Sequence, residues 1–214
     1  MTQIDYNKSD DHYVHNVMKK FKWRYFTGWN FTVQIIYFMT CVTEDIMRLM
    51  KHTSVPNDWI RRVKDFIFTS LFFPGTLFVT LMFWIVYLID RKLVCPVAVE
   101  VVVPSWINHS IHTVIIVVLV IEMRITRHRY SKRSLGLAAL AIYLTAYDIL
   151  FFNAFITDGA WIYPLYQVLN WFYRMLLLVT STTTIFGFYI LGECLSDKLV
   201  GYQLQRINEK INSY

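Results

Sequence analysis

The sequence has few of the residues that interrupt or cross-link a chain. Its 214 residues include only seven glycines and five prolines, so no stretch has the composition of a flexible linker between two domains. The three cysteines, Cys41, Cys95 and Cys194, are scattered and odd in number, and no two of them form a CxxC pair. This pattern predicts neither a disulfide framework nor a zinc site.

Apolar residues, by contrast, are abundant. The sequence is 56% hydrophobic and 17% aromatic, and its mean hydropathy is +0.39. A soluble domain of this length cannot bury so many apolar side chains in one core, which makes a lipid bilayer the natural solvent. The formal net charge of +6 is no evidence for nucleic-acid binding, because Lys and Arg gather at the cytoplasmic rims of membrane proteins. We therefore predict an all-α, polytopic transmembrane helical bundle.

Five apolar segments are long enough to cross a bilayer, which takes about 20 apolar residues for each helix. The second segment contains Pro74 and Gly75, which we expect to kink it. A short aromatic stretch before the last segment is too short to span and is expected to lie in the interface. The predicted spans are residues 26–48, 66–89, 105–123, 134–157 and 171–192.

The spans divide the chain into a polar N-terminal segment (1–25), a transmembrane bundle (26–194) and a cytosolic tail (195–214). With five spans the two ends of the chain lie on opposite sides of the membrane. The side that holds the C terminus then carries thirteen Lys and Arg residues against seven on the other side. The run "RITRHRYSKR" (124–133) contributes most clearly to this excess and suits contact with anionic membrane lipids. We expect a multi-pass protein of the plasma membrane or endoplasmic reticulum with a cytosolic C terminus.

Several polar side chains fall inside these apolar segments, where they are costly and tend to mark function. Thr27 belongs to a polar face of the first span. Asn108 and His112 lie four residues apart and share one face of the third span. Both spans begin on the outer side, so their polar faces start in the same leaflet. Asp148 lies in the fourth span at a similar depth to His112.

The histidine pair His109 and His112 allows three interpretations. An HxxH pair can ligate a metal, but a metal site usually needs a third or fourth ligand, and the sequence has no HExxH motif. A histidine in a membrane helix can simply hydrogen-bond a neighbouring helix. The third possibility is a general base for a hydroxyl nucleophile, with Thr27 as its partner. The residues alone leave all three open.

Several short motifs occur in an order and spacing that resemble one known family. They are "WRYFTGWN" with "VQIIYF" (23–38), "FWIVYLIDRKLVCP" (83–96), "PSWINHSIHT" with "IEMR" (104–124), "WIYP" (161–164) and "ILGE" (190–193). Together they resemble the family of the androgen-induced gene 1 protein and the androgen-dependent TFPI-regulating protein. The resemblance covers about residues 23 to 200, and the block "WINHSIHT" is its most specific part.

The resemblance implies a multispan hydrolase of fatty acid esters of hydroxy fatty acids (FAHFAs), with a catalytic threonine and a catalytic histidine. The matching positions are Thr27, as the nucleophile, and His112, as the base that activates it. It implies a lipid ester substrate, with no cofactor and no metal. The family also has a further hydrophobic span before the threonine motif, where this sequence is short and polar.

Two supporting residues each have two candidate roles. Asn108 lies one helical turn from His112 and could donate a hydrogen bond to an oxyanion, or it could cap the N terminus of its helix. Asp148, which the family pattern does not require, could orient His112 as the carboxylate of a triad does. Alternatively, Asp148 could be a structural aspartate bonded to the "STTT" run (181–184).

Helix length predicts an offset in depth between Thr27 and His112. Thr27 lies seventeen residues from Glu44, whereas His112 lies only ten residues from Glu122. If both acidic residues mark the inner surface, straight upright helices would hold the two side chains at different depths. A catalytic pair therefore requires a tilt or a kink. The contrasting hypothesis is a non-catalytic membrane scaffold or regulator, and a metal-dependent enzyme ranks third.

Overall fold

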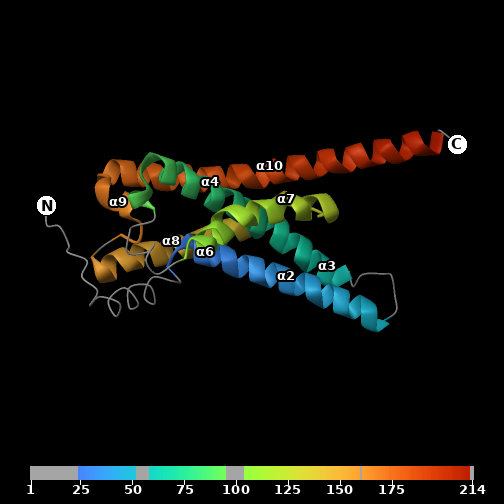
Figure 1. Ribbon diagram of the computed structural model, residues 1–214, viewed down its shortest axis with the longest axis horizontal. Helices are drawn as coiled ribbons and strands as arrows, with labels where there is room; N and C mark the ends of the chain where they lie inside the picture. The colour runs from blue at the N-terminus through green and yellow to red at the C-terminus, as the bar shows by residue number, and fades with distance from the viewer. Residues whose placement is uncertain (1–23, 52–57, 95–103, 160, 213–214) are drawn as a thin grey trace.

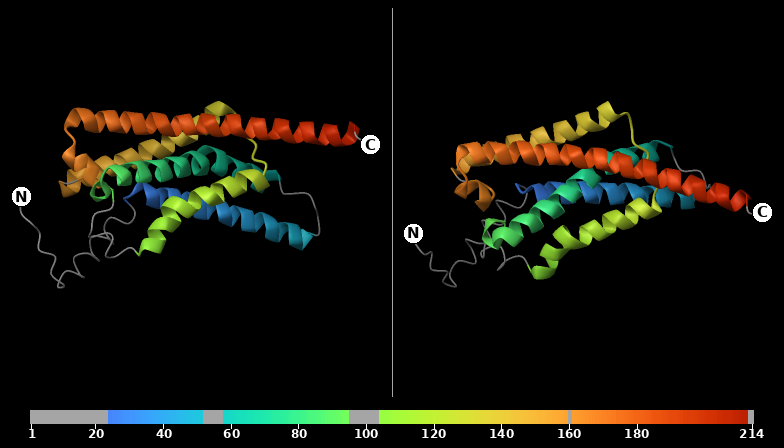
Figure 2. Two further views of the ribbon diagram at one scale, coloured as in Figure 1. Left: turned by 45° about the horizontal axis from the view of Figure 1, so that its top comes forward. Right: turned by 90° about the horizontal axis from the view of Figure 1, so that it is seen from above.

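The protein is a bundle of long helices that run along one common axis (Figures 1 and 2). The structure, a computed structural model, describes residues 24–51, 58–94, 104–159 and 161–212. All regular elements in these ranges are helical, which confirms the predicted all-α class. The polar N-terminal segment lies almost entirely outside the described residues.

The helices follow the predicted segments closely, with two exceptions. The predicted second span is one part of a longer helical stretch, and the last helix continues well past residue 194. In chain order the elements are α2 (Phe26–Lys51), α3 (Asp58–Ile67), the π-helical turn η2 (Phe68–Phe72), α4 (Phe73–Asp90), the 3-10 turn η3 (Arg91–Leu93), α6 (Ser105–His109), the π-helical turn η4 (Ser110–Val114), α7 (Ile115–Ile125), α8 (Arg133–Asp158), α9 (Pro164–Val168) and α10 (Trp171–Asn212).

Four helical stretches in the described part of the chain are long and apolar enough to cross a membrane, by length and composition. They are Asp58–Leu93, Ser105–Ile125, Arg133–Asp158 and Trp171–Lys198. The first predicted span, α2, is as long as α8 but does not belong to this group, so four of the five predicted spans meet this measure and α2 is a more polar fifth helix. The sequence of α2 explains the difference, because Asn30 and Gln34 interrupt its apolar run.

The polar residues of α2 face the inside of the bundle. Asn30 and Gln34 are only 2% and 5% exposed, and both donate hydrogen bonds to the Thr76 hydroxyl of α4, at 3.4 and 3.3 Å. The outward face of the same helix carries exposed apolar side chains such as Phe31 and Ile35. This distribution, with polar groups satisfied internally and apolar groups outside, is the one that a lipid environment requires.

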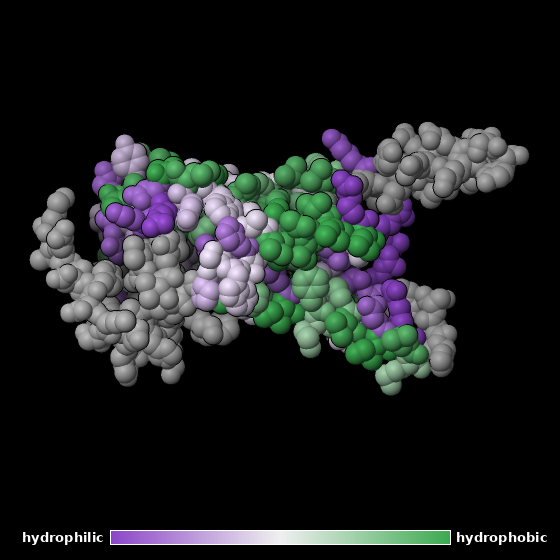
Figure 3. Space-filling model, viewed as in Figure 1, coloured by the Kyte–Doolittle hydropathy of each residue, from purple (hydrophilic) through white to green (hydrophobic). Residues whose placement is uncertain are grey.

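The outer surface of α8 is apolar in the same way. Ile142, Ile149 and Ile156 recur every seven residues on one face of the helix and are 71%, 65% and 78% exposed. On the face shown in Figure 3, hydrophobic residues gather over the middle of the molecule and hydrophilic residues lie towards its ends. So large an exposed apolar surface is unusual for a soluble monomer and suits contact with lipid tails.

Two π-helical turns interrupt the long helices. η2 directly precedes Phe73 and Pro74, and its place agrees with the kink predicted for this segment. Proline has no N–H and crowds the preceding turn, so the helix accommodates it by a local change of hydrogen bonding. The second turn, η4, contains His112. Single π turns inside α-helices are frequent at functional sites.

Gly75 allows α2 to approach α4 closely. A Cβ atom at position 75 would lie 2.7 Å from Oδ1 of Asn30, which is too close for an ordinary contact. The missing side chain therefore leaves room for the amide of Asn30 beside its partner Thr76. This contact positions the helix that carries Thr27.

The end of the bundle away from Thr27 contains buried charges that pair with one another. Glu44, at 2% exposure, accepts hydrogen bonds from Lys64 at 2.5 Å and from Arg48 at 2.7 Å. This arrangement links α2 to α3. Buried charges are tolerated only when they are paired in this way.

His128 forms the second half of this polar cluster. Its Nδ1 lies 3.1 Å from a carboxylate oxygen of Asp65, and its Nε2 lies 3.5 Å from a carboxylate oxygen of Glu122. The ring stacks on Phe68, with the ring centroids 3.7 Å apart, and Tyr37 donates a hydrogen bond to Glu122. The connection between α7 and α8 is thereby fastened to α2 and α3.

The buried pair of Glu44 and Lys64 predicts a difference between two adjacent acidic residues. Glu44→Ala leaves the buried Lys64 ammonium without its carboxylate and should lower the free energy of unfolding by about 3 kcal/mol. Asp45→Ala removes an exposed carboxylate and should change it by less than about 0.5 kcal/mol. Unfolding by sodium dodecyl sulfate in mixed micelles measures both values. Equal losses in the two variants would contradict the assigned role of the pair.

Candidate active site

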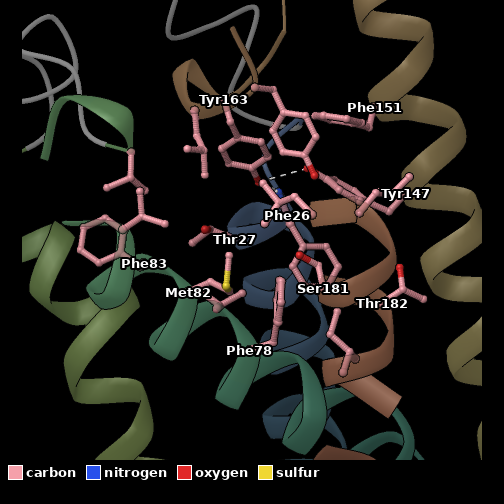
Figure 4. A pocket seen from close by; sticks show the side chains of 18 of the residues that line it. Phe26, Thr27, Phe78, Met82, Phe83, Tyr147, Phe151, Tyr163, Ser181 and Thr182 are labelled. Atoms are coloured by element: carbon pink, nitrogen blue, oxygen red, sulfur yellow. Dashed lines mark hydrogen bonds between the residues drawn. The ribbon is translucent and has the colours of Figure 1, made fainter. Parts of the chain in front are cut away.

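A cavity lies among the start of α2, the middle of α4, η3, η4, α8, α9 and α10 (Figure 4). Its volume is about 140 Å³. Since one water needs roughly 10–15 Å³ in this measure, the cavity has room for several waters or for part of a lipid. Most of its wall is apolar. The polar residues that line it are Thr27, His112, Tyr147, Asp148, Tyr163, Tyr166, Ser181 and Thr182.

Thr27 is the second residue of α2 and is half-buried. Its side chain points towards the cavity in Figure 4. Within the described residues its hydroxyl makes no hydrogen bond. Thr32, one turn further along, behaves differently, because its hydroxyl donates to the carbonyl of Gly28 at 2.9 Å. Thr27 therefore lies where a molecule in the cavity would contact it.

His112 lies in η4 and is 6% exposed. Its ring stacks on Phe83 of α4, with centroids 3.7 Å apart and planes at 9°. Its Nδ1 is buried and has no hydrogen-bond partner in the described part of the structure. Trp84 donates to its backbone carbonyl at 3.3 Å. Packing against Phe83 rather than a carboxylate therefore sets the orientation of the imidazole.

The structure brings Thr27 and His112 to one cavity, although they come from different helices and were predicted to differ in depth. The helix that carries His112 bends between α6 and α7, where η4 lies (Figure 2). No hydrogen bond joins the two side chains in the described residues. Catalytic hydrogen bonds often tighten only when substrate is bound, so the shared cavity is the relevant observation.

Asp148 also lines this cavity, from α8. Neither of its two predicted contacts is present in the described residues. It makes no hydrogen bond to His112, whose Nδ1 has no partner, and none to the hydroxyl run 181–184. Asp148 thus lines the same cavity as the two predicted catalytic residues. Among the described residues, however, it makes no bond that would orient His112 as the carboxylate of a triad does.

Asn108 is not among the residues that line the cavity. It is the fourth residue of α6, and Pro104 occupies the capping position of that helix. The predicted helix-cap role is therefore wrong, because Asn108 lies inside the helix, and the oxyanion role has no support from its position. His109 is exposed and lies beside Trp84. Within the described ranges no group of three His, Cys, Asp or Glu residues could hold a metal ion.

Sequence reasoning missed two tyrosines that hold the start of α2. The Phe26 N–H donates to the Tyr163 hydroxyl at 2.9 Å, and the hydroxyls of Tyr163 and Tyr147 lie 3.1 Å apart (Figure 4). Tyr147 in turn donates to the carbonyl of Arg24 at 3.2 Å. Since Tyr147 has only one hydroxyl proton, Tyr163 must donate to Tyr147. This chain of bonds joins the backbone of Phe26 to that of Arg24, which lie one and three residues before Thr27.

Burial keeps the hydroxyl of Tyr163 protonated. Tyr163 lies between α8 and α9, and burial raises the pKa of its hydroxyl above the usual value near 10. The ring of Phe26 packs against Tyr147, with centroids 4.9 Å apart, and against Phe78 of α4. The first turn of α2, with Thr27 in it, is therefore fixed by aromatic contacts as well as by hydrogen bonds.

Removing the Tyr163 hydroxyl should loosen the first turn of α2. Tyr163→Phe leaves the buried N–H of Phe26 without an acceptor and should lower the free energy of unfolding by about 1–3 kcal/mol. Amide hydrogen exchange at Phe26 should become faster. Tyr173→Phe is the matched control, because Tyr173 is 53% exposed. Unchanged exchange at Phe26 in Tyr163→Phe would show that the bond does not hold this turn.

Comparison with known proteins confirms the family that the motifs resemble. The family model described as FAR-17a/AIG1-like protein matches residues 3–197. The human androgen-induced gene 1 protein is 29% identical, over 88% of this chain and 82% of its own. The human androgen-dependent TFPI-regulating protein is 31% identical, over 82% of this chain and 76% of its own. The mouse form of the latter is 29% identical over 79% of this chain and 74% of its own.

No solved structure matches the chain. The family match nevertheless extends over nearly the whole sequence and includes the helices that form the cavity. This multi-pass helical membrane protein belongs to the FAR-17a/AIG1-like protein family.

Proposed function

We propose that this protein is a membrane-embedded lipid ester hydrolase in which Thr27 is the nucleophile and His112 is the general base. The observation that carries the proposal is that these two residues, from separate helices, line one cavity inside an otherwise apolar bundle. The Thr27 hydroxyl has no partner in the described residues. The motif resemblance suggests FAHFAs as the substrates.

The first half of the reaction is an acyl transfer. His112 takes the proton of the Thr27 hydroxyl as its oxygen attacks the ester carbonyl, because a hydroxyl is a poor nucleophile until a base removes its proton. The tetrahedral intermediate then collapses and the bond to the alcohol oxygen breaks. His112 returns the proton to that oxygen, so the hydroxy fatty acid leaves with its hydroxyl group protonated.

The second half restores the enzyme. A water molecule in the cavity attacks the acyl group on Thr27 while His112 accepts one of its protons. The bond from the carbonyl carbon to the Thr27 oxygen breaks, and His112 returns the proton to that oxygen. The fatty acid is released and the threonine hydroxyl is regenerated. The cavity volume of about 140 Å³ provides room for this water.

The surroundings of the cavity suit a substrate with two apolar chains. Apart from α2, the long helices that line the cavity are long and apolar enough to span a membrane. Its wall is formed largely by side chains such as Phe78, Met82, Leu144 and Ile185. A lipid ester would enter it sideways from the outer leaflet, because its chains are more stable in the bilayer than in water.

The proposed membrane orientation follows from the charges. The loop between α7 and α8, with the run 124–133, lies at the same end of the bundle as the C-terminal part of α10 (Figure 1). We place this end in the cytosol because Lys and Arg are concentrated on cytoplasmic loops. The cavity, at the other end, then faces the outer leaflet of the plasma membrane or the lumenal leaflet of the endoplasmic reticulum.

Labelling with an ester-mimicking fluorophosphonate probe tests the catalytic pair. The purified, detergent-solubilised wild-type protein should be labelled, and Thr27→Ala should lose all labelling because the attacking oxygen is absent. His112→Ala should be labelled at least about 100-fold more slowly, which is the usual contribution of a general base. Thr27→Ser keeps a hydroxyl and should still react.

Two neighbouring variants control for general damage. Thr32→Ala removes a hydroxyl that is bonded to its own helix, and His109→Ala removes the exposed histidine; both should be labelled at the wild-type rate. A chelator should leave labelling unchanged. Labelling that persists in Thr27→Ala would rule out this nucleophile. Absence of labelling in a folded wild-type sample would instead favour a non-catalytic membrane scaffold.

A further inference from the structure

Arg174 is a cation near the start of a membrane-spanning helix, and no carboxylate in the described part of the chain forms an ion pair with it. It is the fourth residue of α10, within the apolar stretch Trp171–Lys198, and it is half-buried. A charged side chain inside a span is costly and usually pairs with an opposite charge or serves a function. Arg174 is therefore a candidate for binding the anionic group of a ligand.

Uncharged groups hold the guanidinium in place. Its Nε donates to the backbone carbonyl of Tyr166 at 2.7 Å, and its Nη2 donates to that of Gln167 at 3.5 Å. The guanidinium carbon lies 5.2 Å from the ring centroids of both Trp161 and Trp171. These contacts restrict the side chain but do not neutralise it, because carbonyls and indoles carry no net charge.

The two carbonyls use only part of the hydrogen-bonding capacity of Arg174. A guanidinium has five N–H donors, of which one on Nε and one on Nη2 are used here. The remaining donors are one on Nη2 and two on Nη1. A carboxylate binds a guanidinium most strongly through two parallel hydrogen bonds, one from each of two nitrogens. The remaining donors of Arg174 are sufficient for such a pair.

Arg174 adjoins the wall of the cavity. Tyr166, whose carbonyl it binds, lines the cavity from α9. Leu177 and Leu178 line it from α10, three and four residues after Arg174, and residues at this spacing share one face of a helix. Ser181 lines it as well, seven residues after Arg174, which is roughly 10 Å along the helix axis. Arg174 thus lies on the cavity side of α10, nearer to the end of the helix than these residues.

A short series of contacts connects Arg174 with the proposed nucleophile. The ring centroid of Tyr166 lies 6.5 Å from that of Tyr163. The Tyr163 hydroxyl accepts the N–H of Phe26 at 2.9 Å, and Phe26 directly precedes Thr27 (Figure 4). The segment that carries Tyr163 and Tyr166 therefore contacts both the cation and the first turn of α2.

The substrate class of the proposed function carries one charge that matches this cation. A FAHFA has a free carboxylate at the end of its hydroxy fatty acid, and its two chains are apolar. In a bilayer the carboxylate stays at the interface with water, because a charge is costly in the hydrocarbon core. Arg174 has a similar place in the protein, beside Trp161 and Trp171, and tryptophan is typical of membrane interfaces.

We propose that Arg174 binds the free carboxylate of the substrate, so that the enzyme prefers carboxylate-bearing esters to uncharged ones. The inference rests on the proposed function and deepens it, because it names the residue that distinguishes a FAHFA from a neutral lipid ester. The carboxylate takes no part in the acyl transfer. Arg174 therefore binds it equally in the ground state and in the transition state, and losing this contact should raise KM more than it lowers kcat.

Two substrates that differ in charge test the role of Arg174. Release of the acyl fatty acid is measured for a FAHFA and for the same ester with its carboxylate converted to an uncharged N,N-dimethylamide. A hydrogen bond to a charged group contributes enough to make the wild-type kcat/KM roughly tenfold or more higher for the acid. Arg174→Gln should bring this ratio close to one, because activity on the acid falls much more than activity on the amide.

Two further variants separate charge from geometry and from general effects. Arg174→Lys keeps the positive charge without the planar fork and should give an intermediate ratio. Arg129→Gln is the matched control, because Arg129 is an exposed arginine in the loop between α7 and α8, at the other end of the bundle (Figure 1). Its ratio should equal that of the wild-type protein.

Three results would overturn the proposal. The first is equal kcat/KM for the acid and the amide in the wild-type protein. The second is a wild-type ratio in both Arg174→Gln and Arg174→Lys. The third is an equal proportional loss on both substrates in both variants, which would give Arg174 a purely structural role in holding α9 against α10.

A binding measurement separates this proposal from the proposed function. A FAHFA with a photoreactive group in its acyl chain is cross-linked to Thr27→Ala, which should bind the ester without hydrolysing it. Unlabelled FAHFA should compete roughly tenfold better than its dimethylamide, and this difference should vanish when Arg174→Gln is added. This result without any hydrolysis by the wild-type protein would support the carboxylate site and contradict the hydrolase. Hydrolysis with equal competition by the two lipids would do the reverse.

Discussion

The fold depends on one constraint: a polar group that enters a bilayer must find its partner inside the protein. α2 shows how this constraint shapes the bundle. Its amides, Asn30 and Gln34, reach Thr76 of α4, and its buried carboxylate Glu44 reaches Lys64 of α3. The polar residues of α2 are thus the ones that bind it to α3 and α4. The same constraint draws attention to Nδ1 of His112, which is buried and has no hydrogen-bond partner among the described residues, in a residue that lines the cavity.

Hydropathy predicted the positions of the helices well because lipid contact and helix length are both local properties of the sequence. The predicted segment 134–157 is α8 at Arg133–Asp158, and the predicted segment 105–123 is Ser105–Ile125. The same signal failed where helix and apolar run do not coincide. α10 continues to Asn212, beyond the apolar residues that marked its predicted end, because a helix needs no apolar side chains to propagate its hydrogen bonds.

The candidate site was predictable in its residue types and only partly in its contacts. The motif resemblance singled out Thr27 and His112, and the depth of an ionisable side chain inside a span singled out Asp148; the structure brings all three to one cavity. The same reasoning placed Asn108 at a helix end, although α6 begins three residues earlier, after Pro104. The bond from Phe26 to Tyr163 joins residues 137 positions apart, and no periodicity in the sequence carries information about a contact over that separation.

The bond between Phe26 and Tyr163 also couples two parts of the cavity mechanically. Tyr163 lies just before α9 and lines the cavity, and Phe26 is the residue before Thr27. Moving Tyr163 outward to widen the cavity stretches or breaks the bond that fixes the first turn of α2. A wider cavity at this wall would therefore come at the cost of a looser first turn of α2, which carries Thr27.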